Sequence, residues 1–127
     1  MPEVAKGLDP WFITGFVDAE STFSISIRKL SKYKVGWYVE PSFTIGLDKK
    51  DLPLLEWIKS TFGGIGSIMR QSEHCYIWRV SSLKDLINTI IPNFDKFTLR
   101  TQKRADFELF KHVVELSVIL LLKKRDC

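Results

Sequence analysis

Two periodicities meet in residues 8–28, LDPWFITGFVDAESTFSISIR. Asp9 can cap the first free N–H groups of a helix, and Pro10 suits the first helical position. Apolar residues then surround most of the helix as far as Glu20, which favours burial on several sides. From Thr22 the period becomes two, as in a strand with one apolar and one polar face. The stretch therefore predicts a buried helix that leads directly into a half-buried strand.

The rest of the chain predicts a further strand, a helix, two strands and two helices, over about 36–47, 48–62, 66–71, 75–81, 82–91 and 101–122. Pro41 implies a bulge or an edge position in the second strand, and Pro92 is expected to end the short helix. The order is αββαββαα. It predicts a single α+β domain (1–127) with a four-stranded antiparallel sheet backed by helices.

Apolar stripes predict which helical side chains reach the core. The expected stripe of the second helix is Leu52, Leu55, Trp57, Ile58 and Phe62. The expected stripe of the last helix is Phe107, Phe110, Val113, Val114 and Leu116.

Composition is ordinary for a soluble globular protein, at 45% hydrophobic and 27% charged residues in 127. The longest apolar run, within residues 116–122, is far shorter than the roughly 20 residues of a membrane span, so no membrane partner is expected. Cys75 and Cys127 lie far apart and suit a reducing compartment better than a disulfide framework. The net charge of +4 is compatible with nucleic acid but shifts the expectation little by itself.

One face of the predicted sheet collects polar side chains from three strands. Ser, Thr, Arg and Tyr reach base edges and phosphates, and a two-stranded ribbon fits the DNA major groove. A face that simply meets water would show the same pattern, because antiparallel sheets often have one solvated face. The residues expected on this face are Ser24, Ser26, Arg28, Tyr38, Glu40, Ser42, Thr44, Arg79 and Ser81.

Two carboxylates, Asp18 and Glu20, end the first helix. Carboxylates rarely lie against an apolar core without a partner, and an acid at a helix C-terminus opposes the helix dipole. A hard divalent cation such as Mg²⁺ takes oxygen ligands, commonly one or two carboxylates together with phosphates. The alternative is that both acids hydrogen-bond neighbouring groups or face water. Asp18 is the better candidate for a helix-end or interface hydrogen-bonding group.

Residues 13–21, ITGFVDAES, resemble the nine-residue motif after which the LAGLIDADG proteins are named. Gly15, Asp18 and Ala19 match that motif, and Glu20 is a close substitution for its second acid. Residues 11–16 and 99–103 are also similar to fungal organellar members, and the resemblance covers about 8–115. It implies a homing endonuclease domain with the LAGLIDADG fold, which cuts double-stranded DNA at a specific sequence.

The resemblance also implies a paired arrangement and a catalytic site. Two such helices pack through small residues, which here places the partner against Phe12, Gly15, Phe16 and Ala19. Glu20 would be the catalytic acid and the ligand of Mg²⁺ or another divalent cation such as Mn²⁺ or Ca²⁺. Lys103 matches a basic position of the family and would polarise water or balance phosphate charge, unless it is simply a solvated helix lysine.

Three features depart from the family pattern. Ser21 stands where the motif ends in glycine, and its bulk is expected to oppose pairing and favour a monomer or weak dimer away from DNA. Thr44 occupies a position where the family often has glutamine. Only one motif is present, so the domain needs a homodimer or a missing C-terminal half.

Other functions stay open on the sequence alone. An intron RNA maturase, a non-catalytic DNA-binding module and a plain interaction domain are the alternatives, and divalent-metal-dependent nicking of DNA separates the endonuclease from all three. The resemblance to fungal organellar members suggests an organelle-encoded protein of the mitochondrion.

Overall fold

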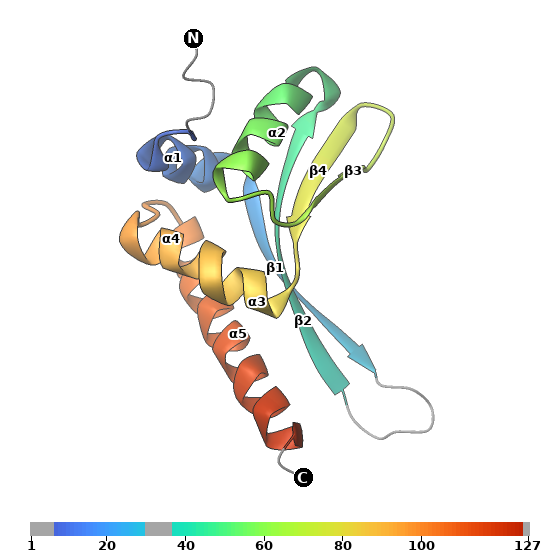
Figure 1. Ribbon diagram of the computed structural model, residues 1–127, viewed down its shortest axis with the longest axis vertical. Helices are drawn as coiled ribbons and strands as arrows, with labels where there is room; N and C mark the ends of the chain where they lie inside the picture. The colour runs from blue at the N-terminus through green and yellow to red at the C-terminus, as the bar shows by residue number, and fades with distance from the viewer. Residues whose placement is uncertain (1–6, 30–36, 126–127) are drawn as a thin grey trace.

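The computed structural model describes residues 7–29 and 37–125, and their side chains except at 28, 37, 38 and 120–125. The predicted α+β order αββαββαα is confirmed (Figure 1). In chain order the elements are α1 (Pro10–Glu20), β1 (Ser21–Lys29), β2 (Trp37–Asp48), η2 (Lys49–Asp51), α2 (Leu52–Thr61), β3 (Ser67–Arg70), β4 (Cys75–Val80), α3 (Leu83–Asp85), η3 (Leu86–Ile90), α4 (Ile91–Lys96) and α5 (Lys103–Arg125).

The four strands form one antiparallel sheet in the order β1-β2-β4-β3. β1 pairs with β2 along its whole length, whereas β4 pairs only with the part of β2 from Phe43 to Asp48. Pro41 lies on the other part of β2, which has β1 as a neighbour on one side only. An edge position tolerates a residue without an N–H group. The edge position is therefore confirmed, and the register with β1 continues across Pro41 without a bulge.

The helices lie on one side of the sheet and leave its other face uncovered (Figure 1). The predicted strand phase is confirmed, because alternate residues of β2 and β4 face the helices and are fully buried. The fully buried side chains of these two strands are Phe43, Ile45, Trp78 and Val80. Helical side chains that pack with them include Ile13, Val17, Leu55, Ile58, Phe107, Phe110 and Val114.

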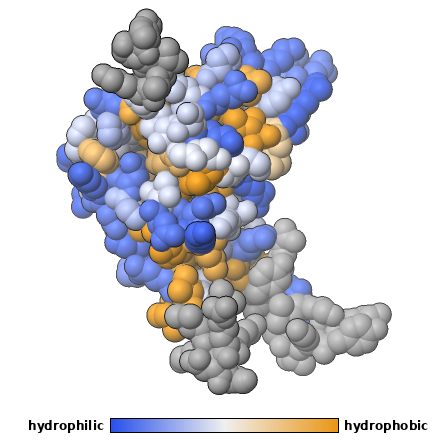
Figure 2. Space-filling view, viewed as in Figure 1, coloured by the Kyte–Doolittle hydropathy of each residue, from blue (hydrophilic) through white to orange (hydrophobic). Residues whose placement is uncertain are grey.

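Two of the predicted core positions are wrong. Trp57 and Leu116 are exposed, at 49% and 59%, because each lies on the side of its helix opposite the buried stripe. Figure 2 shows apolar surface over the lower part of α5. Ile27 keeps the apolar phase of β1 yet is also exposed, since it lies toward the far end of the β1–β2 hairpin.

Among the described helices, α5 included, none has the length and apolar character to cross a membrane.

The predicted helix end at Pro92 is also wrong. A short helix capped by the Ser82 hydroxyl, as expected, passes through the π-helical turn η3 and continues as α4 to Lys96. Pro92 lies in the first turn of α4, where a proline interferes least with helical hydrogen bonding. The wider π turn changes the hydrogen-bond pattern just before the proline, which is the kind of local adjustment that lets a helical segment continue.

Candidate functional site

Asp18 holds the segment that joins α4 to α5. Its carboxylate accepts hydrogen bonds from the Arg100 N–H at 3.0 Å, the Thr101 N–H at 3.2 Å and the Thr101 hydroxyl at 2.9 Å. Thr101 Oγ1 accepts in turn from the N–H of Lys103, the first residue of α5, at 3.2 Å. Asp18 is therefore a hydrogen-bonding group at the helix end, and it fixes where α5 begins.

Thr14 ties α1 to the same segment one turn earlier. Its side chain is buried, and its hydroxyl donates to the Phe97 carbonyl oxygen at 2.7 Å. The Trp11 ring packs edge-on against the Phe97 ring, with centroids 5.2 Å apart. Neither Thr14 nor Thr101 was predicted from the sequence; the signal for Thr14 was a hydroxyl residue within an otherwise apolar helix.

Ser21 does not project toward a partner, which corrects the expectation that its bulk opposes pairing. The residue is only 2% exposed, and its hydroxyl donates to the Val17 carbonyl oxygen at 2.8 Å. Its extended backbone, at φ −99° and ψ 168°, ends α1 and lets the short side chain fold back on the last helical turn. The hydroxymethyl group thus lies inside its own domain.

Glu20 contrasts with its neighbours because its side chain is exposed and makes no hydrogen bond or ion pair with the described residues. The contact between Asp18 and Thr101 brings the C-terminal end of α1 beside the start of α5, where Lys103 is half-buried. No group of three or more His, Cys, Asp or Glu side chains gathers in 7–29 and 37–125. Within the described residues the end of α1 therefore offers the single free carboxylate of Glu20, which fits a divalent cation only if other ligands come from outside this part of the chain.

The side of α1 that faces away from the core is open. Phe12 is 47% exposed, and Gly15 and Ala19 follow it at spacings of three and four residues, both exposed. A Cβ atom added at Gly15 would meet nothing within 4 Å. Phe16, the fourth residue expected on this surface, is half-buried and packs partly against its own core. The surface called the α1 outer face below consists of Phe12, Gly15 and Ala19.

The predicted polar residues share the uncovered face of the sheet. The register pairs Ser24 with Ser42, Ser26 with Glu40, Arg28 with Tyr38, and Thr44 with Arg79. The side chains of Arg28 and Tyr38 lie outside the described residues. Ser81 is exposed just beyond the end of β4.

Ser42 lies on this face as predicted but is only 2% exposed. Its side chain is therefore not accessible for the expected contact with DNA. Its small side chain stands between the longer Glu40 and Thr44, which are its neighbours on the same face of β2. Two exposed residues on the face were missed, since Thr22 pairs with Thr44 and Ser67 with Arg79. The period-two pattern could have identified Thr22, which continues the phase of Ser24.

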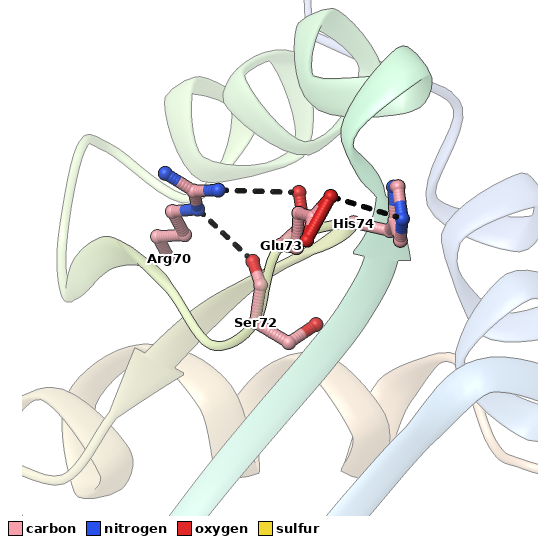
Figure 3. A network of polar contacts seen from close by, with 4 residues as sticks. All are labelled: Arg70, Ser72, Glu73 and His74. Atoms are coloured by element: carbon pink, nitrogen blue, oxygen red, sulfur yellow. Dashed lines mark hydrogen bonds and ion pairs between the residues drawn. The ribbon is translucent and has the colours of Figure 1, made fainter.

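A second polar cluster forms the turn between β3 and β4 (Figure 3). The Arg70 side chain donates to the carbonyl oxygens of Ser72 and Glu73, at 3.1 and 3.5 Å. His74 Nε2 lies 3.7 Å from a Glu73 carboxylate oxygen, and its own carbonyl oxygen accepts from the Lys49 N–H at 2.8 Å. These contacts are local to the turn and the neighbouring end of β2, so they shape the end of the sheet.

Two fungal proteins whose descriptions refer to introns are similar to this chain. A Neurospora crassa protein described as "Probable intron-encoded endonuclease 2" is 44% identical over 114 residues, which are 89% of this chain and 25% of that protein. A Podospora anserina protein described as "Uncharacterized 50.9 kDa protein in ND4 intron 1" is 46% identical over 111 residues, which are 86% of this chain and 24% of that protein. The chain thus spans about a quarter of the length of these relatives.

Solved structures show the same fold bound to DNA. The I-SmaMI LAGLIDADG homing endonuclease bound to cleaved DNA superposes with a TM-score of 0.83 and 47% identity, over 87% of this chain and 37% of that one. A second I-SmaMI structure, bound to uncleaved DNA target in the presence of calcium ions, superposes with a TM-score of 0.82 and 48% identity. The match covers 86% of this chain and 37% of that one. The family model described as LAGLIDADG endonuclease matches residues 13–114. The chain belongs to the LAGLIDADG endonuclease family.

Proposed function

We propose that this chain is one catalytic half of a sequence-specific endonuclease that hydrolyses double-stranded DNA. The observation that carries the proposal is the Glu20 carboxylate, which is exposed and has no partner in 7–29 and 37–125, at the end of a helix whose outer face is open. The uncovered polar face of the sheet supports it, because a two-stranded ribbon such as that of β1 and β2 fits the major groove. The DNA-bound state of the related I-SmaMI agrees with this assignment.

Glu20 would hold a divalent cation, Mg²⁺ in the first instance and otherwise Mn²⁺ or Ca²⁺. The cation, when bound, supplies the positive charge that polarises a phosphoryl oxygen. Phosphate oxygens and a second Glu20 are the ligands that this chain lacks on its own. Lys103 would balance phosphate charge at the same junction. Calcium in an I-SmaMI complex supports a cation-dependent site without fixing the ion.

The α1 outer face would bind the matching helix of a second LAGLIDADG domain. Gly15 and Ala19 lack bulk, so two helix backbones can approach closely there. In a two-fold pair the interface is isologous, and the two Glu20 carboxylates would converge near the axis. The partner would be a second copy or the other half of a longer protein, as the greater length of the relatives suggests.

A mitochondrial gene is the source that best suits the chain. One relative is described as intron-encoded, and another as a protein in an ND4 intron.

The non-catalytic DNA-binding module was favoured only if Ser21 disabled the site, and the buried position of Ser21 inside its own domain speaks against that. No specific feature of the described residues favours an RNA maturase.

The test is the Glu20→Gln variant on duplex DNA that the wild-type chain cuts. The amide keeps the shape of the side chain but loses the charge that a divalent cation requires, so cleavage should be abolished while DNA binding stays largely intact. Glu56→Gln, at an exposed position on α2, is the matched control and should cut normally. Undiminished Mg²⁺-dependent cleavage by Glu20→Gln would show that Glu20 is not the catalytic acid.

A further inference from the structure

An apolar row interrupts the polar face of the sheet. The register aligns Gly46 of β2 with Ile77 of β4, and Ile77 with Met69 of β3. The next row across the same three strands is polar and consists of Thr44, Arg79 and Ser67. Residues two apart on a strand share a face, so both rows lie on the uncovered face. We call Ile77 and Met69 the apolar patch.

Packing of the domain does not account for the apolar patch. The neighbours of these residues along the strands, Trp78 and Ile68, point the other way and pack in the core. Ile77 is half-buried and Met69 is 42% exposed, and neither belongs to the core or packs against it. Fold stability therefore gives no reason for two large apolar side chains at the centre and edge of a polar face.

Gly46 keeps one side of the patch open. A Cβ atom at that position would lie 3.4 Å from Ile77 Cγ2, in ordinary van der Waals contact. With glycine there, no side chain of β2 covers Ile77 in its own row. The apolar surface of Ile77 is thus accessible between β2 and Met69.

The chemistry of DNA limits what such a patch can recognise. Base edges in the major groove carry hydrogen-bond donors and acceptors, and the C5-methyl group of thymine is their only apolar feature. Resting on the proposed function, we propose that Ile77 and Met69 select thymine by contact with its C5-methyl group. Arg79, in the adjacent row, would make a polar base or phosphate contact beside it.

The test starts from duplexes selected by the full chain from a library with a randomised segment, in Ca²⁺ so that the target is held uncleaved as in the I-SmaMI complex. Each thymine of the selected sequence is then replaced singly by deoxyuridine, which removes only the methyl group. At one or two positions the replacement should weaken binding about fourfold, the factor that corresponds to burial of one methyl-sized group.

Variants assign that loss to the patch. In Ile77→Ser or Met69→Ser, which leave no methyl group at the position, the difference between thymine and deoxyuridine at such a position should fall to about the level of the other positions, whereas Ile77→Val should keep it. Leu116→Ser, which replaces an exposed leucine on α5, is the matched control and should bind as the wild type does. The wild-type comparison of thymine with deoxyuridine needs no variant, so a folding defect cannot hide the result.

The outcomes separate the two proposals. Sequence-selective binding with no deoxyuridine effect at any position, or with an effect that survives both serine variants, overturns the thymine assignment and leaves the endonuclease proposal standing. A selected sequence that contains no thymine would also overturn the thymine assignment and leave the endonuclease proposal standing. Failure to select any duplex overturns both proposals together.

Discussion

The two sides of α1 serve different purposes. On the inner side Ile13, Thr14 and Val17 are buried, and Thr14 and Asp18 hydrogen-bond the segment that precedes α5. On the other side the α1 outer face stays exposed, and Glu20 ends the helix without a partner among the described residues. Of two acids only two residues apart, Asp18 thus helps to build the domain, whereas Glu20 is the acid proposed to act outside it.

Gly15→Leu should have the largest effect on function. Its bulk would keep a second helix away from the α1 outer face, so cleavage should be lost. The domain itself should stay folded and gain about 0.5–1 kcal/mol, because leucine is a better helix former than glycine and the added Cβ meets open space. Cleavage assays and urea unfolding measure the two effects. Wild-type cleavage by Gly15→Leu would mean that the outer face does not pair.

Asp18→Ala and Glu20→Ala test the difference between the two acids through the free energy of unfolding. Loss of the Asp18 carboxylate leaves the N–H groups of Arg100 and Thr101 without their acceptor, so unfolding free energy should fall by about 1–3 kcal/mol. Glu20→Ala should change it by less than about 0.5 kcal/mol, as for an exposed side chain without contacts. Equal losses in the two variants, measured by urea unfolding, would remove the distinction.

The ion pair between Lys111 and Asp95 should have a small effect on stability and none on cleavage, since it joins α4 to α5 and includes no residue of α1. Lys111 Nζ lies 2.8 and 2.9 Å from the two carboxylate oxygens. Because the pair is partly exposed, Lys111→Met should cost no more than about 1 kcal/mol, and cleavage should not change.

The pH dependence of that small effect has a definite sign. The hydrogen bond with Asp95 raises the pKa of Lys111 above its ordinary value of 10.5. A raised pKa in the folded state means that the stabilisation is fully present below pH 10.5 and is lost as the pH rises through the folded-state pKa. The difference in unfolding free energy between wild type and Lys111→Met should therefore shrink above pH 10.5. A difference that grows with pH would contradict this.

Local pattern was sufficient for the sheet. The alternation of Phe23 and Ile25 with Ser24 and Ser26 allows only one assignment of faces, and the register agrees with it. The same pattern could not show that Ile27 lies beyond the cover of the helices, because that depends on where elements distant in the sequence end. The sequence therefore predicts to which face of the sheet a side chain points, but not whether the helices cover that side chain.

The kinds of residue at the site could be predicted from the sequence, but most of their contacts could not. Asp18 bonds to groups 82 and 83 residues away, and no local pattern indicates contacts at that separation. Ser21 turns inward because of the extended backbone at the helix end, which the residue type alone does not determine. The apolar patch went unnoticed although period two places Ile77 on the same face as Arg79, because only the pairing with Gly46 and Met69 shows that a second apolar side chain lies beside Ile77 and that no side chain of β2 covers it.

The mass of the chain on DNA tests the central claim most directly, which is that the α1 outer face pairs two domains over one duplex. Two negative Glu20 carboxylates near the axis disfavour a free dimer, so light scattering should give a monomer or a weak dimer without DNA. On a duplex that the chain cuts, the account predicts two chains per duplex for the wild type and one for Gly15→Leu. A single chain per duplex that cuts both strands, unaffected by Gly15→Leu, would contradict it.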